Sequence, residues 1–342
     1  MRNALGLMLA SVVTAVVIAG VWFWAFAPHA DAAAPQTVAA RTAEPLPAAA
    51  AKLSPRDDVE ITATLSKPAP APAPAAPQPV KSACANPDGL GVSRTVVIDT
   101  TGGPGFGFLQ YKQFDFLTDK EVVLTFDDGP WPTTPAVLKA LADECTKAVF
   151  FPVGKHTTYH PEILKQVAAA GHTVGSHTWS HAHLDSKKLT EAQVREEIEK
   201  GFSAVKMAIG TAPAPFFRFP ALAHTQPALA YLASRNIAMF SVDVDSNDFK
   251  STGPDQVINN VMTKLDKQGK GVILMHDLQK HTAQALPTLL RRLKAGGYKV
   301  VHMRAKEQLE TLPEYDAMLV KDQKVPAVAS RPISSVVQTV SQ

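Results

Sequence analysis

The stretch Thr125–Pro130, which reads TFDDGP, follows the short apolar run Glu121–Leu124. The run is typical of a β-strand, and the Gly-Pro pair turns the chain away directly after it. Two adjacent acids, Asp127 and Asp128, therefore lie where a predicted strand ends. Neighbouring carboxylates repel each other, so keeping both of them charged requires a compensating cation. Taken alone, the stretch favours an ordinary acidic turn, with a metal site as the alternative.

Strand and helix patterns alternate along the chain from residue 120 onward. The segments typical of strands are Val122–Phe126, Ala148–Val153, His172–Ser176, Phe216–Phe219, Ile237–Asp243, Val272–His276 and Lys299–Met303. The helical patterns between them are Thr134–Glu144, Pro161–Ala170, Thr190–Ala208, Gln226–Ser234, Pro254–Asp266 and Thr282–Ala295. When each strand is joined to the next by a helix, the strands run parallel to one another and the crossovers are right-handed. The sequence therefore predicts an α/β fold. An open doubly wound sheet fits the pattern too, but seven such units favour a small, distorted seven-stranded (β/α) barrel.

The chain before this region changes composition several times. Residues 1–27 contain a long uncharged and largely apolar run, residues 4–27, which predicts a cleaved signal peptide or an N-terminal transmembrane anchor. Residues 28–83 are rich in Ala and Pro, a composition that favours an extended, disordered linker. Residues 84–119 are expected to pack on the following domain as an N-terminal extension, with a strand at Thr95–Asp99.

Both interpretations of the N-terminal segment export the rest of the chain. We therefore expect a periplasmic or cell-envelope location, with anchoring in the inner membrane through residues 4–27 where the segment is not cleaved. The main domain is expected over residues 120–305. Residues 306–342 form the predicted C-terminal tail, with a short helix near Lys306–Leu312.

The composition argues against some classes of function. A formal net charge of +3 is too small to indicate nucleic acid binding. The Gly-rich stretch 101–107 lacks the Gly-Lys-Ser/Thr ending of a phosphate loop, so a turn-rich loop is expected there. The two cysteines, Cys84 and Cys145, lack the spacing of a zinc knuckle, and the sequence leaves open whether they pair in a disulfide. It leaves the oligomeric state open as well.

Polar side chains gather at the carboxyl ends of the predicted strands. They are Asp127 and Asp128 after the first strand, His177 and His181 after the third, Arg218 at the end of the fourth, Asp243, Asp245 and Asp248 around the end of the fifth, and His276 at the end of the sixth. In parallel α/β proteins this end of the strands is where sites are built. Because several loops agree on one rim, the pattern favours a functional site.

His177 and His181 are separated by four positions, so on one helical turn they would face the same way. Such a pair by itself more often lies on the protein surface without binding a metal. Together with a carboxylate from the first strand it forms an Asp-His-His set. Nitrogen and oxygen ligands of this kind suit Zn²⁺ and leave a position for water or substrate.

Five stretches match the motifs of a known family in order. They are TFDDGP, SHTWSH, RFP, DSNDF and ILMH, and together they resemble the five motifs of the polysaccharide deacetylases, carbohydrate esterase family 4. The match covers residues 120–303. The resemblance implies a distorted (β/α) barrel. It also implies a hydrolase that removes N-acetyl groups from N-acetylhexosamine units of a glycan, such as peptidoglycan, chitooligosaccharide or an exopolysaccharide.

The resemblance also implies roles in proton transfer. Asp127 would be the general base that activates water, and Arg218 would pair with it and keep it oriented and ionised. His276 would be the general acid toward the leaving amine. Asp248 would pair with His276 and favour the protonated imidazole that an acid needs.

A metal site follows from the same resemblance. Asp128, His177 and His181 would hold a divalent ion, with Zn²⁺ expected first and Co²⁺ or Ni²⁺ as alternatives. The ion would polarise the acetyl carbonyl of a bound glycan.

The expected substrate pocket departs from the family pattern at two positions. The third motif usually ends in Tyr and here ends in Ala221, whose backbone N–H, just after Pro220, is the expected oxyanion donor. The fourth motif usually ends in Trp and here ends in Phe249. Leu274 would line the pocket for the acetyl methyl group, and a sugar ring could stack on Trp131. The departures at Ala221 and Phe249 suggest a site of altered shape and not an inactive one, because every charged or ligating position of the motifs is filled.

Two alternatives remain from the sequence. The first is another hydrolase on the same scaffold, which would cleave an O-acetyl ester or a cyclic amide. The second is a catalytically silent glycan-binding protein of the cell envelope. The filled set of base, metal ligands and acid argues against the second, because a binding module has no need of all three.

Overall fold

The computed structural model describes residues 86–324. The expected signal or anchor segment 1–27 and the expected linker 28–83 lie outside the described residues, as does the end of the expected tail from residue 325 onward. Among the residues that are described, no helix combines the length and the apolar character that a membrane crossing requires.

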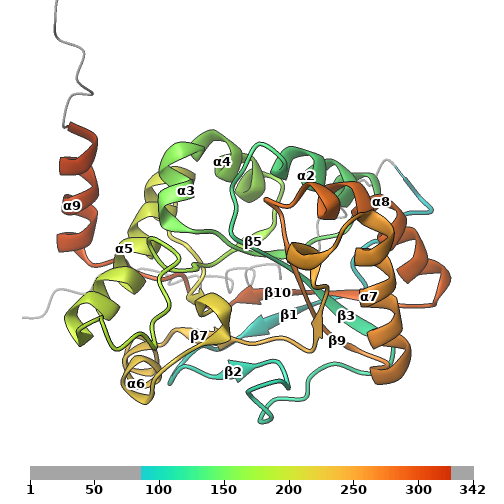
Figure 1. Ribbon diagram of the computed structural model, residues 1–342, viewed down its shortest axis with the longest axis horizontal. Helices are drawn as coiled ribbons and strands as arrows, with labels where there is room; N and C mark the ends of the chain where they lie inside the picture. Colours follow the sequence, from blue (N-terminus) through green and yellow to red (C-terminus); the bar gives the residue numbers. More distant parts are fainter. Residues whose placement is uncertain (1–85, 325–342) are drawn as a thin grey trace, which may run out of the picture. The chain divides into compact units, whose positions relative to one another are not determined.

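The main sheet contains seven strands, and β3 lies at its centre (Figure 1). Its strands are β1 (Arg94–Ile98), β3 (Glu121–Asp127), β4 (Val149–Phe151), β5 (Thr173–Val174), β8 (Val244–Asp245), β9 (Gly271–His276) and β10 (Lys299–Ala305). Strand β9 pairs with β3 from Val122 to Asp127, while β10 pairs with the first two residues of β3 and β4 with its last three. Every pairing in the sheet is parallel, which confirms the predicted α/β class.

A second, smaller sheet runs in the order β2 (Gly105–Phe106), β7 (Ala238–Phe240) and β6 (Phe216–Phe217), also with parallel pairings. A bridge between Ser176 and Phe217 connects it to the chain just after β5. Beyond β7 the chain runs on beside β9, where the Asp243 N–H donates to the Val272 carbonyl. The two sheets are therefore linked at two places.

Helices connect most of the strands in the order that the sequence predicts. The described helices are α2 (Thr134–Asp143), α3 (Gly154–Tyr159), α4 (Pro161–Ala169), α5 (Glu191–Ile209), α6 (Gln226–Ser234), α7 (Pro254–Gln268), α8 (Lys280–Ala295) and α9 (Pro313–Lys324), with short 3₁₀ turns η1 (Pro220–Leu222) and η2 (Asp248–Lys250). Helix α5 begins with a capping box between Thr190 and Gln193. Helix α3 went unpredicted because six residues are too few to show a helical period.

The helix expected at Lys306–Leu312 is wrong. That segment is not helical, and helix α9 begins after it, at Pro313. Proline disfavours helical geometry in the residue before it and suits the first turn of a helix, so the helix starts at the proline. Helix α9 packs on α5, where Lys206 and Asp316 form an ion pair with an N–O distance of 2.8 Å.

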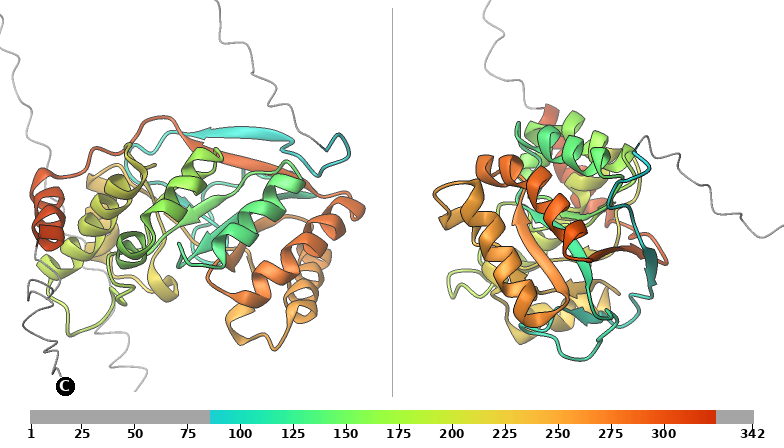
Figure 2. Two further views of the ribbon diagram at one scale, coloured as in Figure 1. Left: turned by 90° about the horizontal axis from the view of Figure 1, so that it is seen from above. Right: turned by 90° about the vertical axis from the view of Figure 1, so that its right-hand side faces the viewer.

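The segment before β3 contributes strands to both sheets. Strand β1 pairs with β10 along its whole length, and the two lie side by side in Figure 2. The Gly-rich stretch 101–107 contains β2 instead of a phosphate loop. At Gly107 a Cβ atom would lie only 2.6 Å from the backbone of Ser241, and φ is +97°. Glycine therefore lets the chain approach β7 closely.

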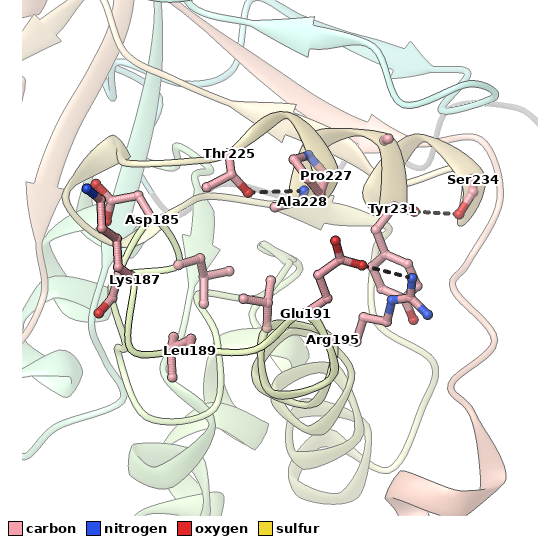
Figure 3. Close-up of a pocket in the computed structure, with 14 residues that line it drawn as sticks. Asp185, Lys187, Leu189, Glu191, Arg195, Thr225, Pro227, Ala228, Tyr231 and Ser234 are labelled. Atoms are coloured by element: carbon pink, nitrogen blue, oxygen red, sulfur yellow. Dashed lines mark hydrogen bonds and ion pairs between the residues drawn. The ribbon is translucent and has the colours of Figure 1, made fainter.

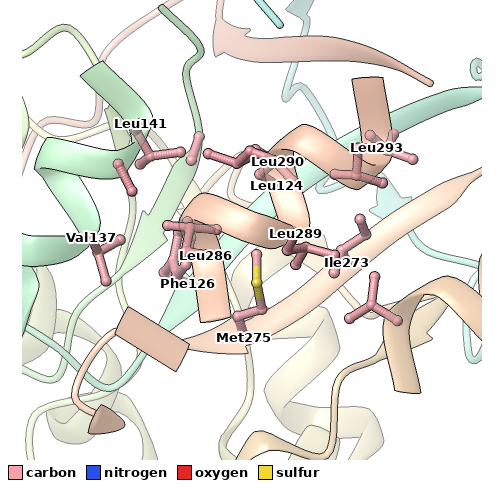
Figure 4. Packing of buried hydrophobic residues seen from close by; sticks show 14 of the residues in the cluster. Leu124, Phe126, Val137, Leu141, Ile273, Met275, Leu286, Leu289, Leu290 and Leu293 are labelled. Carbon is pink, nitrogen blue, oxygen red and sulfur yellow. The ribbon is translucent and has the colours of Figure 1, made fainter. Parts of the chain in front are cut away.

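Strand β3 is buried along its whole length, and its side chains alternate between two regions of the core. Leu124 and Phe126 pack against helices α2 and α8 (Figure 4). Val123 belongs instead to the cluster that contains Phe216 and Phe240 of the smaller sheet. Because side chains alternate along a strand, Asp127 shares the face of Val123. The carboxylate of Asp127 is thus directed toward the space between the two sheets.

The core around α8 gives a test of the packing. Leu289 is fully buried in the cluster shown in Figure 4, so Leu289→Ala leaves a cavity and should lower the free energy of unfolding by about 2–5 kcal/mol. Gln284→Ala, at an exposed position of the same helix, is the control and should change it by less than about 0.5 kcal/mol. Urea denaturation followed by circular dichroism measures both. Equal stability of the two variants would contradict this packing.

Candidate active site

The pairing of β3 with β9 places two of the predicted site residues next to each other. In the register of these strands Asp127 is the partner of His276, so the predicted base and acid end two adjacent parallel strands. Beyond this point the chain turns away in both strands, with Asp128 and Gly129 following β3 and Asp277 following β9. The predicted proton-transfer residues therefore meet at one rim.

Arg218 lies beneath this rim and is completely buried. One guanidinium nitrogen donates to Asp127 Oδ1 at 2.7 Å and to Thr125 Oγ1 at 2.8 Å. The other terminal nitrogen donates to the Ser241 carbonyl at 3.0 Å, and the guanidinium carbon lies 4.5 Å from the centre of the Phe151 ring. These contacts fix the guanidinium and, through it, the carboxylate of Asp127.

Burial is the largest influence on Asp127. It raises the pKa of this carboxyl above its ordinary value, while the charges of Arg218, His276 and His181 act in the opposite direction. The sequence had suggested that Arg218 keeps Asp127 ionised. In the structure the arginine opposes the effect of burial and does not outweigh it. A carboxylate with a raised pKa accepts a proton more readily, which suits a base.

Asp128, His177 and His181 form a separate group that could hold a metal ion. Asp128 Oδ1 lies 3.5 Å from His177 Nε2 and 3.3 Å from His181 Nε2. This oxygen is buried and has no hydrogen-bond partner among the described residues. A buried carboxylate oxygen without a donor, facing two imidazole nitrogens, is the arrangement that a divalent cation satisfies.

The state of His177 fits a ligand. Its Nδ1 lies 2.7 Å from the carbonyl oxygen of Arg218, so this nitrogen carries the proton and Nε2 keeps its lone pair for a metal. Burial lowers the pKa of His177 to about 3, so the ring is neutral near pH 7. Arg218 thus orients Asp127 through its side chain and His177 through its backbone.

His177 and His181 meet through a loop, whereas their spacing had suggested a helical turn. Thr178 and His181 have φ angles of 68° and 61°, which no right-handed helix contains. The ring centres of the two histidines lie 5.1 Å apart. The loop is fixed by Glu197 of α5, which accepts hydrogen bonds from the backbone N–H and the hydroxyl of Ser180 at 2.8 and 2.6 Å.

Asp248, which is buried, and His276, which is partly buried, form a second pair. His276 Nδ1 donates to Asp248 Oδ1 at 2.6 Å, and the backbone N–H of His276 donates to Oδ2 at 2.7 Å. Thr282 at the start of α8 also donates to Oδ2. Burial acts to lower the pKa of His276, but the hydrogen bond and the charge of Asp248 outweigh it and raise that pKa to about 9. The imidazole is therefore protonated near pH 7, as an acid must be.

The residues expected to shape a pocket lie around this rim. Pro220 and Ala221 form η1, where Ala221 has an unusual φ of 52°. Leu274 lies in β9, two positions before His276. The ring of Phe249 is 51% exposed and contacts His276 edge-on, with 5.7 Å between ring centres.

Trp131 follows the two acids and is partly exposed. It packs against two imidazoles that the sequence had assigned no role, His156 and His160, with 5.1 and 5.3 Å between ring centres. His156 also reaches the metal group, because its Nδ1 donates to the Asp128 carbonyl at 2.5 Å. Trp131 is thus held beside the predicted metal ligands.

Two acids of the rim stay outside the cluster. Asp243 accepts hydrogen bonds from the backbone N–H groups of Phe108 and Val272, and Asp245 accepts from that of Asn247. Asp243 thus links segments that are far apart in the chain, whereas Asp245 supports a local turn. Sequence reasoning missed Glu197, since a charged residue on an amphipathic helix gives no signal of the loop it holds.

A separate groove of about 650 Å³ lies between α6, the start of α5 and the loop before it (Figure 3). Leu184, Val194 and Ala228 give it an apolar lining. Arg195 lies over the ring of Tyr231, 5.1 Å from its centre. None of its described lining residues belongs to the predicted site. The predicted site, at the ends of β3 and β9, is therefore separate from this groove.

Known proteins are similar to this chain in sequence. The family model described as polysaccharide deacetylase matches residues 116–240. The peptidoglycan-N-acetylglucosamine deacetylase PgdA of Listeria monocytogenes is 34% identical over 188 residues, which are 54% of this chain and 38% of that protein. The chain thus matches less than half of the Listeria protein. The chitooligosaccharide deacetylase of Sinorhizobium fredii is 30% identical over 175 residues, 48% of this chain and 80% of that protein.

A solved structure agrees with these matches. The peptidoglycan deacetylase Bd3279 of Bdellovibrio bacteriovorus superimposes with a TM-score of 0.56 at 34% identity, covering 63% of this chain and 59% of that one. The match to the Sinorhizobium protein covers most of that relative. The chain belongs to the polysaccharide deacetylase family.

Proposed function

We propose that this protein is a metal-dependent hydrolase that removes N-acetyl groups from N-acetylhexosamine units of a glycan. One observation carries the proposal. Asp127 with its arginine, the Asp128–His177–His181 group and the Asp248–His276 pair occupy one rim of the fold. Together they supply a base, a cation site and an acid, which amide hydrolysis requires.

The metal ligands in this proposal are Asp128, His177 and His181. Two imidazoles and one carboxylate suit Zn²⁺, and Co²⁺ or Ni²⁺ would fit the same donors. A bound divalent ion supplies Lewis acidity toward the acetyl carbonyl and lowers the pKa of water. The buried Oδ1 of Asp128, which has no hydrogen-bond partner within residues 86–324, supports this assignment from the chain's own geometry.

The chain's own residues move the protons. Asp127, fixed by Arg218 and with its pKa raised by burial, takes a proton from the attacking water. His276 carries its proton on the nitrogen that faces away from Asp248 and delivers it to the amine as the C–N bond breaks. Amine nitrogen is a poor leaving group without this proton, so Asp248 contributes by keeping His276 protonated.

Rim residues would orient the sugar. Ala221 would offer its backbone N–H to the developing oxyanion, since η1 begins two residues after Arg218 in the chain. Leu274 would contact the acetyl methyl group. Phe249 and Trp131 expose aromatic surface beside the acid and beside the metal group, which suits stacking against sugar rings.

Peptidoglycan is the substrate that the family matches favour. The Listeria and Bdellovibrio proteins carry peptidoglycan deacetylase names, while the Sinorhizobium protein is named for chitooligosaccharide. Both glycans present N-acetylhexosamine units. We place the protein in the cell envelope, either exported or anchored through residues 4–27. The disulfide bond of Cys145 supports an oxidising compartment.

For the fold, we propose a distorted (β/α) barrel. Parallel pairings run from β8 through β9, β3 and β4 to β5, and the bridge from Ser176 to Phe217 continues them to β6. Strand β6 pairs with β7, and the chain after β7 returns to β9 as β8. This succession of contacts supports a ring of strands with the predicted site at one end.

Acetate release tests the activity. The full-length protein with Zn²⁺ should release acetate from peptidoglycan or chitooligosaccharide, and not from acetylxylan, which carries O-acetyl esters. Asp127→Asn and His276→Ala each remove a proton-transfer group and should lower kcat by about 10²- to 10⁴-fold. Asp185→Asn, at an exposed acid of the groove in Figure 3, is the control and should keep wild-type turnover.

Two results would contradict the proposal. One is near-wild-type turnover in either variant while its circular dichroism spectrum is native. The other is acetate release from acetylxylan alone, which would assign an O-acetyl esterase.

The pH profile tests the acid separately. Because Asp248 raises the pKa of His276 to about 9, kcat should fall as pH rises through about 9. Asp248→Asn removes the charge that favours the protonated imidazole, so its alkaline limb should move to lower pH. Asp245→Asn makes the same chemical change at an acid that accepts from a backbone N–H nearby, and its limb should stay in place. An unmoved limb in Asp248→Asn would exclude His276 as the acid.

A further inference from the structure

Asp277 follows the predicted acid His276 and has no role in the steps described above. Its side chain is buried, yet it carries a carboxylate. Oδ1 accepts a hydrogen bond from the backbone N–H of Gly129 at 2.9 Å, and Oδ2 accepts one from the hydroxyl of Thr134 at 2.6 Å. The Thr133 hydroxyl donates to the backbone carbonyl of Asp277 at 2.7 Å. All of these contacts are with the segment that follows the metal ligand Asp128.

The bond to Gly129 acts on Asp128 directly. The Gly129 N–H and the Asp128 carbonyl belong to one planar peptide group. Asp277 holds the N–H of this group, and His156 holds its carbonyl oxygen at 2.5 Å. The peptide plane is therefore fixed from both sides. Asp128 itself has a φ of 73°, a conformation that L-residues seldom adopt and that its surroundings must maintain.

The approach of Asp277 to this peptide is unusually close. A Cβ atom at Gly129 would lie 2.1 Å from Asp277 Oδ2 and 2.4 Å from Oδ1. Any residue other than glycine would push the carboxylate and the loop apart. Glycine at this position is thus explained by the carboxylate as much as by the turn.

We propose that Asp277 is a positioning residue of the metal site, an inference that rests on the metal-binding role proposed for Asp128. Its carboxylate fixes the peptide after Asp128, so that Oδ1 of Asp128 faces His177 and His181. Because Asp277 adjoins His276 in the chain, it also ties the metal ligand of one strand to the acid of the next. A carboxylate in this place holds the donor set ready before a metal binds.

The test is a zinc titration of the full-length protein, stripped of metal and followed by calorimetry. Asp277→Asn keeps the size of the side chain but replaces one of the two accepting oxygens with an amide NH₂. Removing a partner that orients a metal ligand should raise the Kd for Zn²⁺ by about 10- to 100-fold. Raising Zn²⁺ above this new Kd should restore most of the lost acetate release.

Glu121→Gln is the matched control. Glu121 is also a buried acid and pairs with Arg94 at 2.6 Å, but it lies at the opposite end of β3. This variant should lower the melting temperature and leave the Kd for Zn²⁺ unchanged. Gly129→Ala breaks the contact with Asp277 from the other side without altering the carboxylate, so it should raise the Kd as well and serves where Asp277→Asn folds poorly.

The outcomes separate the two proposals. If the wild-type protein binds Zn²⁺ and Asp277→Asn binds it equally well despite a lower melting temperature, Asp277 is structural and the positioning role is overturned. If the wild-type protein binds no Zn²⁺, the proposed metal-dependent function fails, and the positioning role fails with it.

Discussion

The repulsion between two adjacent carboxylates is the constraint on which this site depends. Asp127 and Asp128 end a strand whose residues are nearly all withdrawn from water, where like charges are least tolerated. The fold separates them by giving each a different partner. Asp127 continues the alternation of β3 and meets Arg218 between the sheets. Asp128 leaves the strand with a positive φ and meets two imidazoles instead.

The same geometry explains how the fold carries the chemistry. The packing of β3 and β9 against α2 and α8 fixes the register in which Asp127 stands opposite His276. Each of the reactive groups is then oriented by a partner of a different kind. Arg218 orients the proposed base Asp127, its backbone carbonyl orients His177, and Asp248 orients the proposed acid His276. The packing of the hydrophobic core thus maintains the distances between these few polar side chains.

Much of this could be predicted from the sequence, because it rests on local patterns. The Asp and His residues at the ends of the predicted strands indicated a site at that rim, and the ordered motifs indicated the family. The loop between His177 and His181 could not be predicted, since its left-handed residues are held by Glu197 of the following helix α5, and the sequence gives no signal of that contact. The helix at the C-terminal end was misplaced because its start at Pro313 was overlooked. The contact between Asp277 and Gly129 joins residues that are 148 positions apart, and no local pattern reports such a distance.

Whether Asp128 binds the metal while Asp127 does not can be measured directly. X-ray diffraction from crystals of the zinc-loaded protein, with data on both sides of the zinc absorption edge, locates the ion from its anomalous signal. The account predicts a single strong peak within about 2.0–2.2 Å of a carboxylate oxygen of Asp128 and of Nε2 of His177 and His181. Asp127 should remain bound to Arg218 and outside the coordination sphere. A zinc ion held by Asp127 in place of Asp128, or bound away from this rim, would contradict it.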